Sequence, residues 1–478
     1  MGNYGANILV PIAFFSWTPF VLFLYRKLDK RLVPVVAYVA GWLLLPCANY
    51  DIFLLKNTKS TVIAYGVLAG AWLFDRERLS SFQFKSADIP MLLWCTAPFF
   101  SSVFNDLGVY DGLSATLYTS ILWGIPYYLG RVYFTDDDVL KTLALTIFIG
   151  GLVYVPFSWF ELIMSPQLHR LTYGFHQHNF LQTLREDGGY RPMIFMDHGL
   201  MTAMWMMLSS LLGTWLYMTK ALPKTILSVP SPILLGILVL TFFMYQSMAA
   251  IAFFLVTITI LVVGTKGNNA LLVIVLLILP QLYIFTRATG YWDGTNVSNY
   301  IEKNISPARA QSLQFRFDNE TILINKAMQA DGPFGWGGYG RARVYDEEGK
   351  DVSVTDGLWV IALGNQGTYG LFWLVLCVQL PTMLLFMKIK PTEWGSEGFA
   401  APAAMAIFIG VTMIDNLLNA MVNPLYQVFA GGIIGLLTKE TINLPAVAEK
   451  NSDLFEAVKT EMSRFMTDPG TKRPKFIS

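Results

Sequence analysis

Charged residues are scarce in this chain. Only 14% of its 478 residues are Asp, Glu, Lys or Arg, whereas 54% are hydrophobic, and soluble globular domains carry about 25% charged residues. The net charge is only +1, and no basic block with interleaved aromatic residues is present, so we expect no nucleic-acid partner. The composition therefore excludes an ordinary soluble domain and indicates a polytopic membrane protein.

Cysteine and histidine are also rare. The three cysteines, Cys47, Cys95 and Cys377, lie in apolar runs with neither disulfide nor zinc spacing, and we interpret them as small core residues. The four histidines fall in one polar segment, at His169, His176, His178 and His198. Their spacing is too loose for a metal site, so we expect no metal and no cofactor. The start, MGNYGANILV, lacks the basic flank of a signal peptide, and we expect its apolar run to be retained as a span.

Long apolar runs dominate what remains. Runs of roughly 17 to 25 apolar residues predict an all-α polytopic fold with about 12 to 14 transmembrane helices. The predicted spans start near Ile8, Leu32, Thr61, Ile89, Leu113, Val139, Gly199, Ile226, Met248, Ala270, Gly357, Pro402 and Leu425. Glycines between Gly364 and Gly370 could break the span from Gly357.

Basic residues predict the orientation. Lys and Arg fall on alternate loops, such as Arg26 to Arg31, Lys220 with Lys224, and Lys388 with Lys390, which places these loops in the cytoplasm, with the N-terminus outside and the C-terminus inside. The chain then divides into N-terminal spans (1–163), a first outer loop (164–198), central spans (199–286), a large outer loop (287–355), C-terminal spans (356–438) and a cytoplasmic tail (439–478). In the tail, apolar residues from Leu454 to Phe465 predict either one face of a short helix on the inner leaflet or part of a solvated tail.

Candidate site residues gather in the two outer loops. Arg191, Asp197 and His198 come together just where a span begins, and Arg191 could bind an anionic substrate or simply a lipid phosphate. The other three histidines are best interpreted as interfacial. In the second loop, four arginines bracket the run GPFGWGGYG: Arg309, Arg316, Arg341 and Arg343. Arginine suits phosphate because its planar fork makes bidentate, permanently charged hydrogen bonds.

The glycines and two aspartates have alternative interpretations. The glycine-rich run either exposes backbone N–H groups to an anion or allows a tight turn; it does not follow a strand of a βαβ unit, so a dinucleotide fold is not supported. Asp356 could cap the helix that follows it or act as a base. Asp415, inside a late span beside Asn416, Asn419 and Asn423, is expected to make interhelical hydrogen bonds.

The order of these parts resembles the O-antigen ligase and polymerase superfamily of bacterial membrane glycosyltransferases. The resemblance runs from about Arg191 to Met387. It rests on Arg191 in YRPMIFMDHGL, Arg316 in FRFDNETILINKA, the GPFGWG element at Gly332 to Gly337, and the pair Gly367 and Gly370 in LGNQGTYGL. Family ligases usually have a histidine where this chain has Asp356, and many members have an arginine where Met248 follows Ser247, so the wider polymerase is favoured over the ligase.

The resemblance implies a GT-C-like fold in the bacterial inner membrane, with two periplasmic loops. It implies a donor glycan on undecaprenyl diphosphate, whose diphosphate would be bound by Arg191, Arg316, Arg341 and Arg343, and a glycan or lipid-glycan acceptor. Asp356 would be the base and His198 the second candidate, while Gly335, Trp336, Gly337 and Gly338 would shape the loop. A diphosphate leaving group needs charge stabilisation, which arginines supply without a metal.

Two function classes remain as alternatives to this polymerase or ligase. A transporter of polysaccharide or lipid-linked sugar should carry charges in the middle of its spans, whereas charge here is concentrated in outer loops, with Asp415 the main exception. A noncatalytic scaffold would not need arginines and carboxylates at one mouth of the bundle.

The predicted orientation is testable by cysteine labelling. Single cysteines at Gly349 and Gly188, in a cysteine-free background, should react with an impermeant thiol reagent in cells whose outer membrane is permeabilised, because both positions lie in predicted outer loops. A cysteine at Ser80 should stay unlabelled. The reverse pattern would place the candidate site in the cytoplasm.

Overall fold

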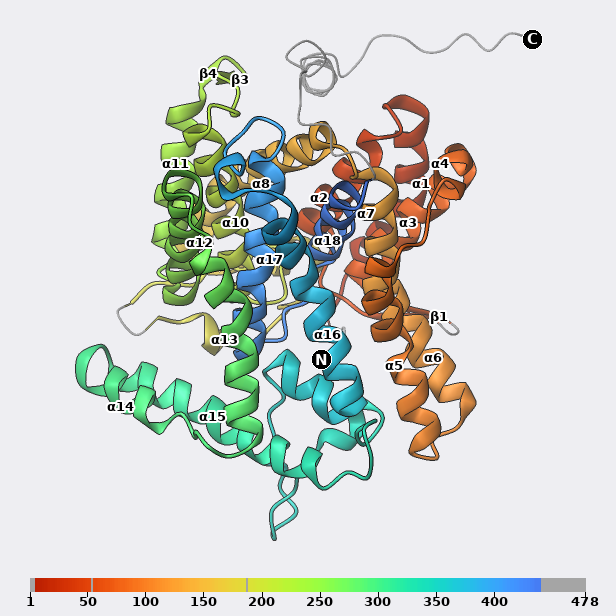
Figure 1. Ribbon diagram of the computed structural model, residues 1–478, viewed down its shortest axis with the longest axis vertical. Coiled ribbons are helices and arrows are strands. Elements are labelled where there is room, and N and C mark those ends of the chain that lie inside the picture. The colour runs from red at the N-terminus through yellow and green to blue at the C-terminus, as the bar shows by residue number, and fades with distance from the viewer. Residues whose placement is uncertain (1–4, 53–54, 186–187, 440–478) are drawn as a thin grey trace.

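The computed structural model describes residues 5–52, 55–185 and 188–439 (Figure 1). These parts of the chain are almost entirely helical, and their strands form only two short antiparallel hairpins. In the first, β1 (Tyr50–Ile52) pairs with β2 (Leu55–Asn57), and in the second β3 (Thr225–Ile226) pairs with β4 (Val229–Pro230). The all-α class predicted from the sequence is therefore confirmed. The predicted tail helix lies outside the described residues.

Within the described ranges, eight helices are long and apolar enough to cross a membrane: α1 (Leu9–Lys27), α5 (Ile89–Phe104) together with the turn that precedes it (Ser86–Phe104), α8 (Asp137–Met164), α10 (Gly199–Met218), α12 (Met248–Gly267), α13 (Leu271–Ala288), α16 (Leu358–Lys388) and α17 (Ala400–Leu418). Four shorter apolar helices accompany them: α2 (Leu32–Leu44), α3 (Lys59–Phe74), α11 (Ser231–Met244) and α18 (Pro424–Leu437). The chain is a multi-pass membrane protein. Twelve of the predicted spans fall on these helices, and the thirteenth falls on α6 (Val109–Thr119) and α7 (Ile125–Tyr133), which a π-helical turn joins. How many of the shorter ones cross the membrane stays a prediction.

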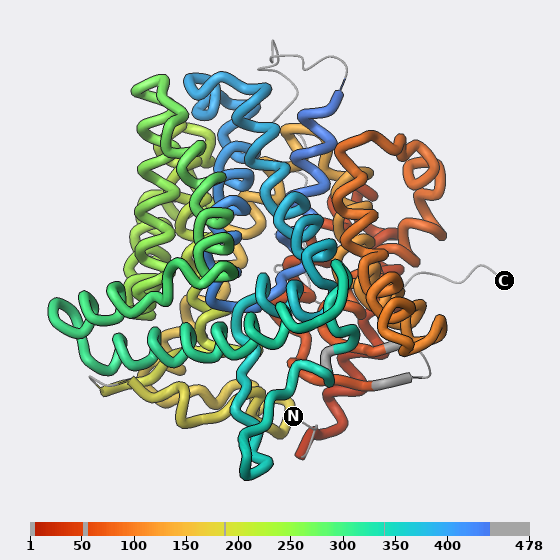
Figure 2. The backbone as a smooth tube through the Cα atoms, turned by 60° about the horizontal axis from the view of Figure 1, so that its bottom comes forward, coloured from red at the N-terminus to blue at the C-terminus, as the bar shows by residue number. Residues whose placement is uncertain are grey.

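The remaining helices lie at the ends of the bundle or in its connections. They are α4 (Arg76–Ser80), α9 (Leu168–Tyr173), α14 (Thr295–Asn304) and α15 (Pro307–Met328), with one-turn helices η1 (Ser86–Asp88), η3 (Phe180–Thr183), η4 (Tyr339–Ala342) and η5 (Pro391–Glu393). In Figure 1, α14 and α15 lie across the lower end of α13 rather than along it. Figure 2 shows this pair in green passing over the end of the bundle, near the yellow segment that precedes α10.

The two predicted outer loops lie at the same end of the bundle, and several predicted inner loops meet at the opposite end. Contacts among the latter include Lys388 Nζ, which donates to the carbonyl of Leu437 at 2.8 Å, the Lys85 ammonium on the carbonyl of Thr438, and an ion pair of Lys439 with Asp136. The arrangement agrees with alternate loops facing alternate sides. Which side is the cytoplasm stays a prediction.

Among the eight long helices, α10 and α17 are the most buried, with about 83% and 78% of their most apolar stretch buried, against 22% for α13. The peripheral helices expose leucine, isoleucine and phenylalanine side chains. Such faces are stable against lipid tails, which are as apolar as the side chains. The bundle therefore has a protein-packed centre and a lipid-facing rim.

The span that begins near Gly357 is broken, and the glycine-rich run fits into the break. Gly367 has φ 68° and ψ −165° inside α16. At this point the N–H of Tyr369 donates to the carbonyl of Pro333 at 3.0 Å, and the N–H of Trp336 donates to the carbonyl of Gly364 at 2.8 Å. The backbone groups freed by the break are thus bonded to the loop, as burial at membrane depth requires.

We expect Gly367→Ala to destabilise the protein. A Cβ at this position would overlap the carbonyl of Pro333, and the backbone conformation disfavours an L-residue by about 1–3 kcal/mol before that overlap is counted. A clear fall in melting temperature of the purified protein in detergent is the expected result. Gly340→Ala is the matched control, because its Cβ would meet no atom within 4 Å. Equal melting temperatures of the two variants would contradict this explanation of the break.

Candidate functional site: an arginine cluster at one end of the bundle

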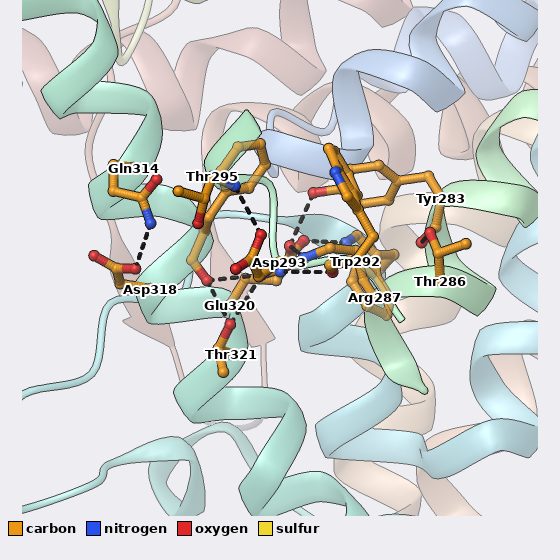
Figure 3. Close-up of polar contacts among 12 residues, drawn as sticks. Tyr283, Thr286, Arg287, Trp292, Asp293, Thr295, Gln314, Asp318, Glu320 and Thr321 are labelled. Carbon is orange, nitrogen blue, oxygen red and sulfur yellow. Dashed lines mark hydrogen bonds and ion pairs between the residues drawn. The ribbon is translucent and has the colours of Figure 1, made fainter. Parts of the chain in front are cut away.

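A buried ion pair attaches α15 to the end of the bundle (Figure 3). Arg287, in the last turn of α13, donates from Nε to Oε2 of Glu320 at 2.7 Å, and the two side chains are 2% and 5% exposed. Tyr283 Oη donates to the same oxygen at 2.8 Å, and Trp359 Nε1 donates to Oε1 at 2.6 Å. The Arg287 Nη2 also donates to the carbonyl of Phe317 at 2.7 Å. Three helices, α13, α15 and α16, are therefore joined through one carboxylate.

Arg316 lies four residues before Glu320 and so on the same face of α15. Its Nη1 donates to the carbonyl of Leu418 at 3.1 Å and to Oδ1 of Asn419 at 3.0 Å, both at the end of α17. The Nδ2 of Asn419 in turn donates to Oδ1 of Asp415 at 2.7 Å. The hydrogen bond of Asp415 therefore lies within the end of α17 and not between helices as expected, and it orients the amide that receives Arg316.

A second buried carboxylate holds the segment that carries Arg191. Glu161, near the end of α8, accepts backbone N–H bonds from Met193 and Ile194, each at 2.8 Å, and from Leu168 at 3.0 Å. The side chain of Arg191 then lies against Gly199, where a Cβ would overlap its Cγ and Cδ. The glycine at the first position of α10 therefore leaves room for this side chain.

The hydrogen bonds of Glu320 and Glu161 hold segments that carry arginines close to one another. Four arginines come together, and we call them the arginine cluster: Arg185, Arg191, Arg309 and Arg316. Burial lowers the pKa of Arg191, and repulsion from Arg316 and Arg309 lowers it further. Burial and repulsion from Arg191 and Arg309 lower the pKa of Arg185 to about 10. A guanidinium group keeps its charge in proteins, so the repulsion persists.

The cluster has cations but no paired anions. Among the described residues, none of its four guanidinium groups forms a salt bridge with a carboxylate. In the same ranges, Nε and Nη2 of Arg185 and Nε of Arg191 are buried without a hydrogen-bond partner. Unsatisfied buried donors and like charges are both unfavourable, and an anion with several oxygens would relieve both. The site can therefore bind a polyanionic group such as a diphosphate.

His198 is close to the cluster but serves as a helix cap. Its Nδ1 accepts the N–H of Leu200 at 3.0 Å, which assigns the proton of the neutral ring to Nε2. Burial, followed by the charges of His178, Arg191 and Arg316, lowers its pKa to about 3. The lone pair of the neutral ring is already used, so the geometry does not favour His198 as a proton acceptor.

Asp356 is available for that role. It is half-buried and lines a small pocket together with Arg316, Gly357 and Leu418. The capping alternative is not observed, since the cap residue of α16 is Gly357 and no side chain caps this end. Within the described residues, the Asp356 carboxylate makes no hydrogen bond or ion pair. A carboxylate beside Arg316 of the cluster is thus free to accept a proton in the described structure.

The other predicted site residues bond to the loop itself and to α16. Arg341 donates from Nη1 to the carbonyl of Trp336 at 3.0 Å, and Arg343 forms an ion pair with Asp351 in the loop. Gly335, Gly337 and Gly338 all have positive φ, and Trp336 packs against Gly364 and donates from Nε1 to Oδ1 of Asn365 at 3.0 Å. The glycine-rich run therefore fits the turn interpretation.

His169 and His176 make local contacts within their own segment and its neighbours. His169 is buried, with Nε2 accepting the N–H of Cys47 at 3.1 Å and Nδ1 bonded to the carbonyl of Phe175 at 2.9 Å. The ring of His176 packs against the ring of Phe180, with the two ring planes tilted relative to each other. No group of three potential metal-binding side chains occurs within the ranges that the structure describes.

No family model matches the chain, and no curated protein does either. The candidate site therefore rests on its own geometry. Sequence reasoning identified Arg191, Arg309 and Arg316 but missed Arg185, for which the only signal was its place in the same polar segment. It also missed Arg287 and Glu320, which position Arg316.

We expect Gly199→Ala to weaken anion binding by displacing Arg191. A hydrogen bond to a charged group contributes about 1.5–3 kcal/mol. Loss of the bonds from Arg191 should therefore raise the Kd for inorganic pyrophosphate roughly tenfold or more. Calorimetry on purified protein measures this, and Gly236→Ala in α11 is the control, since its Cβ would meet no atom within 4 Å. Unchanged affinity of Gly199→Ala for pyrophosphate would show that Arg191 does not contribute to anion binding.

Proposed function

We propose that this protein is a membrane glycosyltransferase of the O-antigen polymerase and ligase type. The observation that supports the proposal best is the arginine cluster, whose buried donors lack partners and whose four cations lack paired acids in the described structure. It suits the diphosphate of an undecaprenyl-diphosphate-linked glycan, because that group offers several anionic oxygens at the membrane surface. In this proposal the bundle is GT-C-like with 12 to 14 spans, and it lies in a bacterial inner membrane with the cluster on the periplasmic side and the C-terminus in the cytoplasm.

The proposed reaction needs only groups present at the site. The acceptor hydroxyl attacks the anomeric carbon of the donor, the bond from that carbon to the diphosphate oxygen breaks, and undecaprenyl diphosphate leaves with the electron pair. Arg185, Arg191, Arg309 and Arg316 stabilise the charge that grows on the leaving diphosphate. Asp356 accepts the proton of the acceptor hydroxyl. Arg341 and Arg343, which bond within the loop at this end, are proposed as secondary contacts of the donor diphosphate.

Polymerisation of lipid-linked repeat units is the preferred form of this activity, with ligation to a lipid acceptor as the alternative. Asp356 in place of the usual ligase histidine favours the polymerase. The deciding experiment incubates purified protein with lipid-linked oligosaccharide and separates the products by size. A ladder identifies a polymerase, and one added block on a lipid acceptor identifies a ligase. Absence of transfer, combined with movement of lipid-linked sugar across proteoliposomes, would instead establish a transporter.

We expect Asp356→Asn to keep the fold and lose transfer. The substitution preserves size, and this side chain makes no hydrogen bond whose loss would destabilise the described structure. Removal of a general base costs about 10²–10⁴-fold in rate. Transfer should therefore fall at least a hundredfold at unchanged melting temperature, and Asp356→His should recover part of the rate.

The control is Asp318→Asn, an exposed carboxylate on α15 that accepts a bond only from Gln314 in the described structure; it should transfer normally. Wild-type transfer by Asp356→Asn would exclude Asp356 as the base and return His198 to consideration.

A further inference from the structure

A large polar cavity adjoins the arginine cluster and has no role in the reaction proposed for the cluster. Its volume is about 540 Å³, and its walls come from α2, α3, the segment before α10, the first turn of α10 and the link between α17 and α18. Lining side chains include Trp42, Lys59, Gln177, His178 and Asp197. Cavities of this size bind small molecules or parts of larger ones.

The buried side chain of Lys59 indicates that this cavity is a binding site and not a void left by imperfect packing. The residue is only 5% exposed, yet it lines the cavity. Its ammonium donates to the carbonyl of Phe195 at 2.5 Å and lies 5.2 Å from the ring of Trp42. An ammonium has three N–H donors, and the one protein oxygen leaves others for a bound molecule. A buried cation is costly, so its presence at a cavity wall calls for an explanation by ligand binding.

The charges of the cavity are balanced, unlike those of the arginine cluster. Asp197 lines the same space with an exposed carboxylate, and its charge acts on Lys59. The wall also carries the buried Nδ1 of His178, which has no hydrogen-bond partner in the described structure. One cation, one anion and neutral donors and acceptors suit a neutral polyhydroxy molecule. Trp42 and Phe175 add the ring faces on which the C–H groups of such a molecule can pack.

The cavity and the cluster share a wall. The ring of His178 contacts that of His198 edge-on, with centroids 4.7 Å apart, and His198 lies within electrostatic reach of Arg191 and Arg316. Ala420, on the far wall, directly follows Asn419, which accepts the hydrogen bond from Arg316. A molecule whose charged end is at the arginines can thus extend its neutral part into the cavity.

We infer that this cavity binds neutral sugar units of the glycan substrate while the arginine cluster holds the diphosphate. The inference rests on the proposed function and assigns it a glycan site. The other large cavity, of about 310 Å³, offers a contrast because its wall includes Pro11, Phe14 and Phe15 and no charged residue. That cavity lacks the pair of opposite charges that Lys59 and Asp197 give the larger one.

Photo-crosslinking in glycan-producing cells tests the assignment whatever the identity of the sugar. Benzoylphenylalanine placed at Met201 or at Ala420, both on the cavity wall, should give a glycan-bearing crosslinked band after irradiation. The same group at Phe15, in the smaller cavity without charged residues, should not. Absence of a glycan adduct at both Met201 and Ala420, or equal adducts at Phe15, would overturn the inference.

A blocking variant separates the two proposals. Ala420→Trp should fill part of the cavity and lower transfer by about tenfold or more, while binding of geranyl diphosphate, which carries no sugar, stays within about twofold of wild type. Val109→Trp, at an exposed site on α6, is the control. Normal transfer by Ala420→Trp would overturn the cavity assignment and leave the proposed transferase function intact.

A wild-type protein that binds geranyl diphosphate but transfers no glycan would refute the proposed transferase function. The glycan adduct at Met201 would then be the only test of the cavity assignment. If Ala420→Trp also loses binding of geranyl diphosphate, the substitution has disturbed Arg316 rather than only the cavity. The glycan adduct at Met201 then decides whether the cavity binds sugar.

Discussion

The buried pair of Arg287 and Glu320 is the interaction on which the candidate site depends most. Neither charge could stay buried alone, because desolvation of an unpaired ion costs several kcal/mol. Four hydrogen bonds from Arg287, Tyr283 and Trp359, including the one from Arg287 to the carbonyl of Phe317, fix α15 against α13 and α16. Because Arg316 lies one turn away on the same helix, the pair also fixes where its guanidinium can reach.

The structure contains two kinds of buried charge, and the difference between them identifies the site. Glu320 and Glu161 accept hydrogen bonds from several donors, so they are structural. Arg185 and Arg191, in contrast, have buried nitrogen atoms without partners in the described structure, and they repel each other. The fold satisfies these two carboxylates but leaves nitrogen atoms of these two cations without partners where a ligand can approach. Lys59 beside the large cavity is a weaker case, because its ammonium has one oxygen partner and further N–H donors for a ligand.

Glycine contributes through close packing rather than through a phosphate-binding loop. At Gly199 the missing side chain makes room for Arg191, and at Gly364 it makes room for the Trp336 ring. At Gly367 a positive φ breaks α16 and lets the glycine-rich run bond to the freed backbone. These three positions connect the membrane helices to the outer loops, so the glycines place the site without contacting a ligand themselves.

The sequence by itself determined the helices, because apolar length and the positions of glycine, proline and charge are local properties. Twelve predicted spans coincide with apolar helices, and even the break near Gly367 could be anticipated from its neighbouring glycines. The sequence also indicated that arginines of two outer loops matter. Only the tertiary structure decided which of them meet: Arg185 joins Arg191, Arg309 and Arg316, whereas Arg341 and Arg343 bond within their own loop. Likewise, the roles of Glu161, Lys59 and Glu320 depend on partners from 7 to 136 residues away in the chain. No local pattern encodes such pairings, since they arise from how the helices pack.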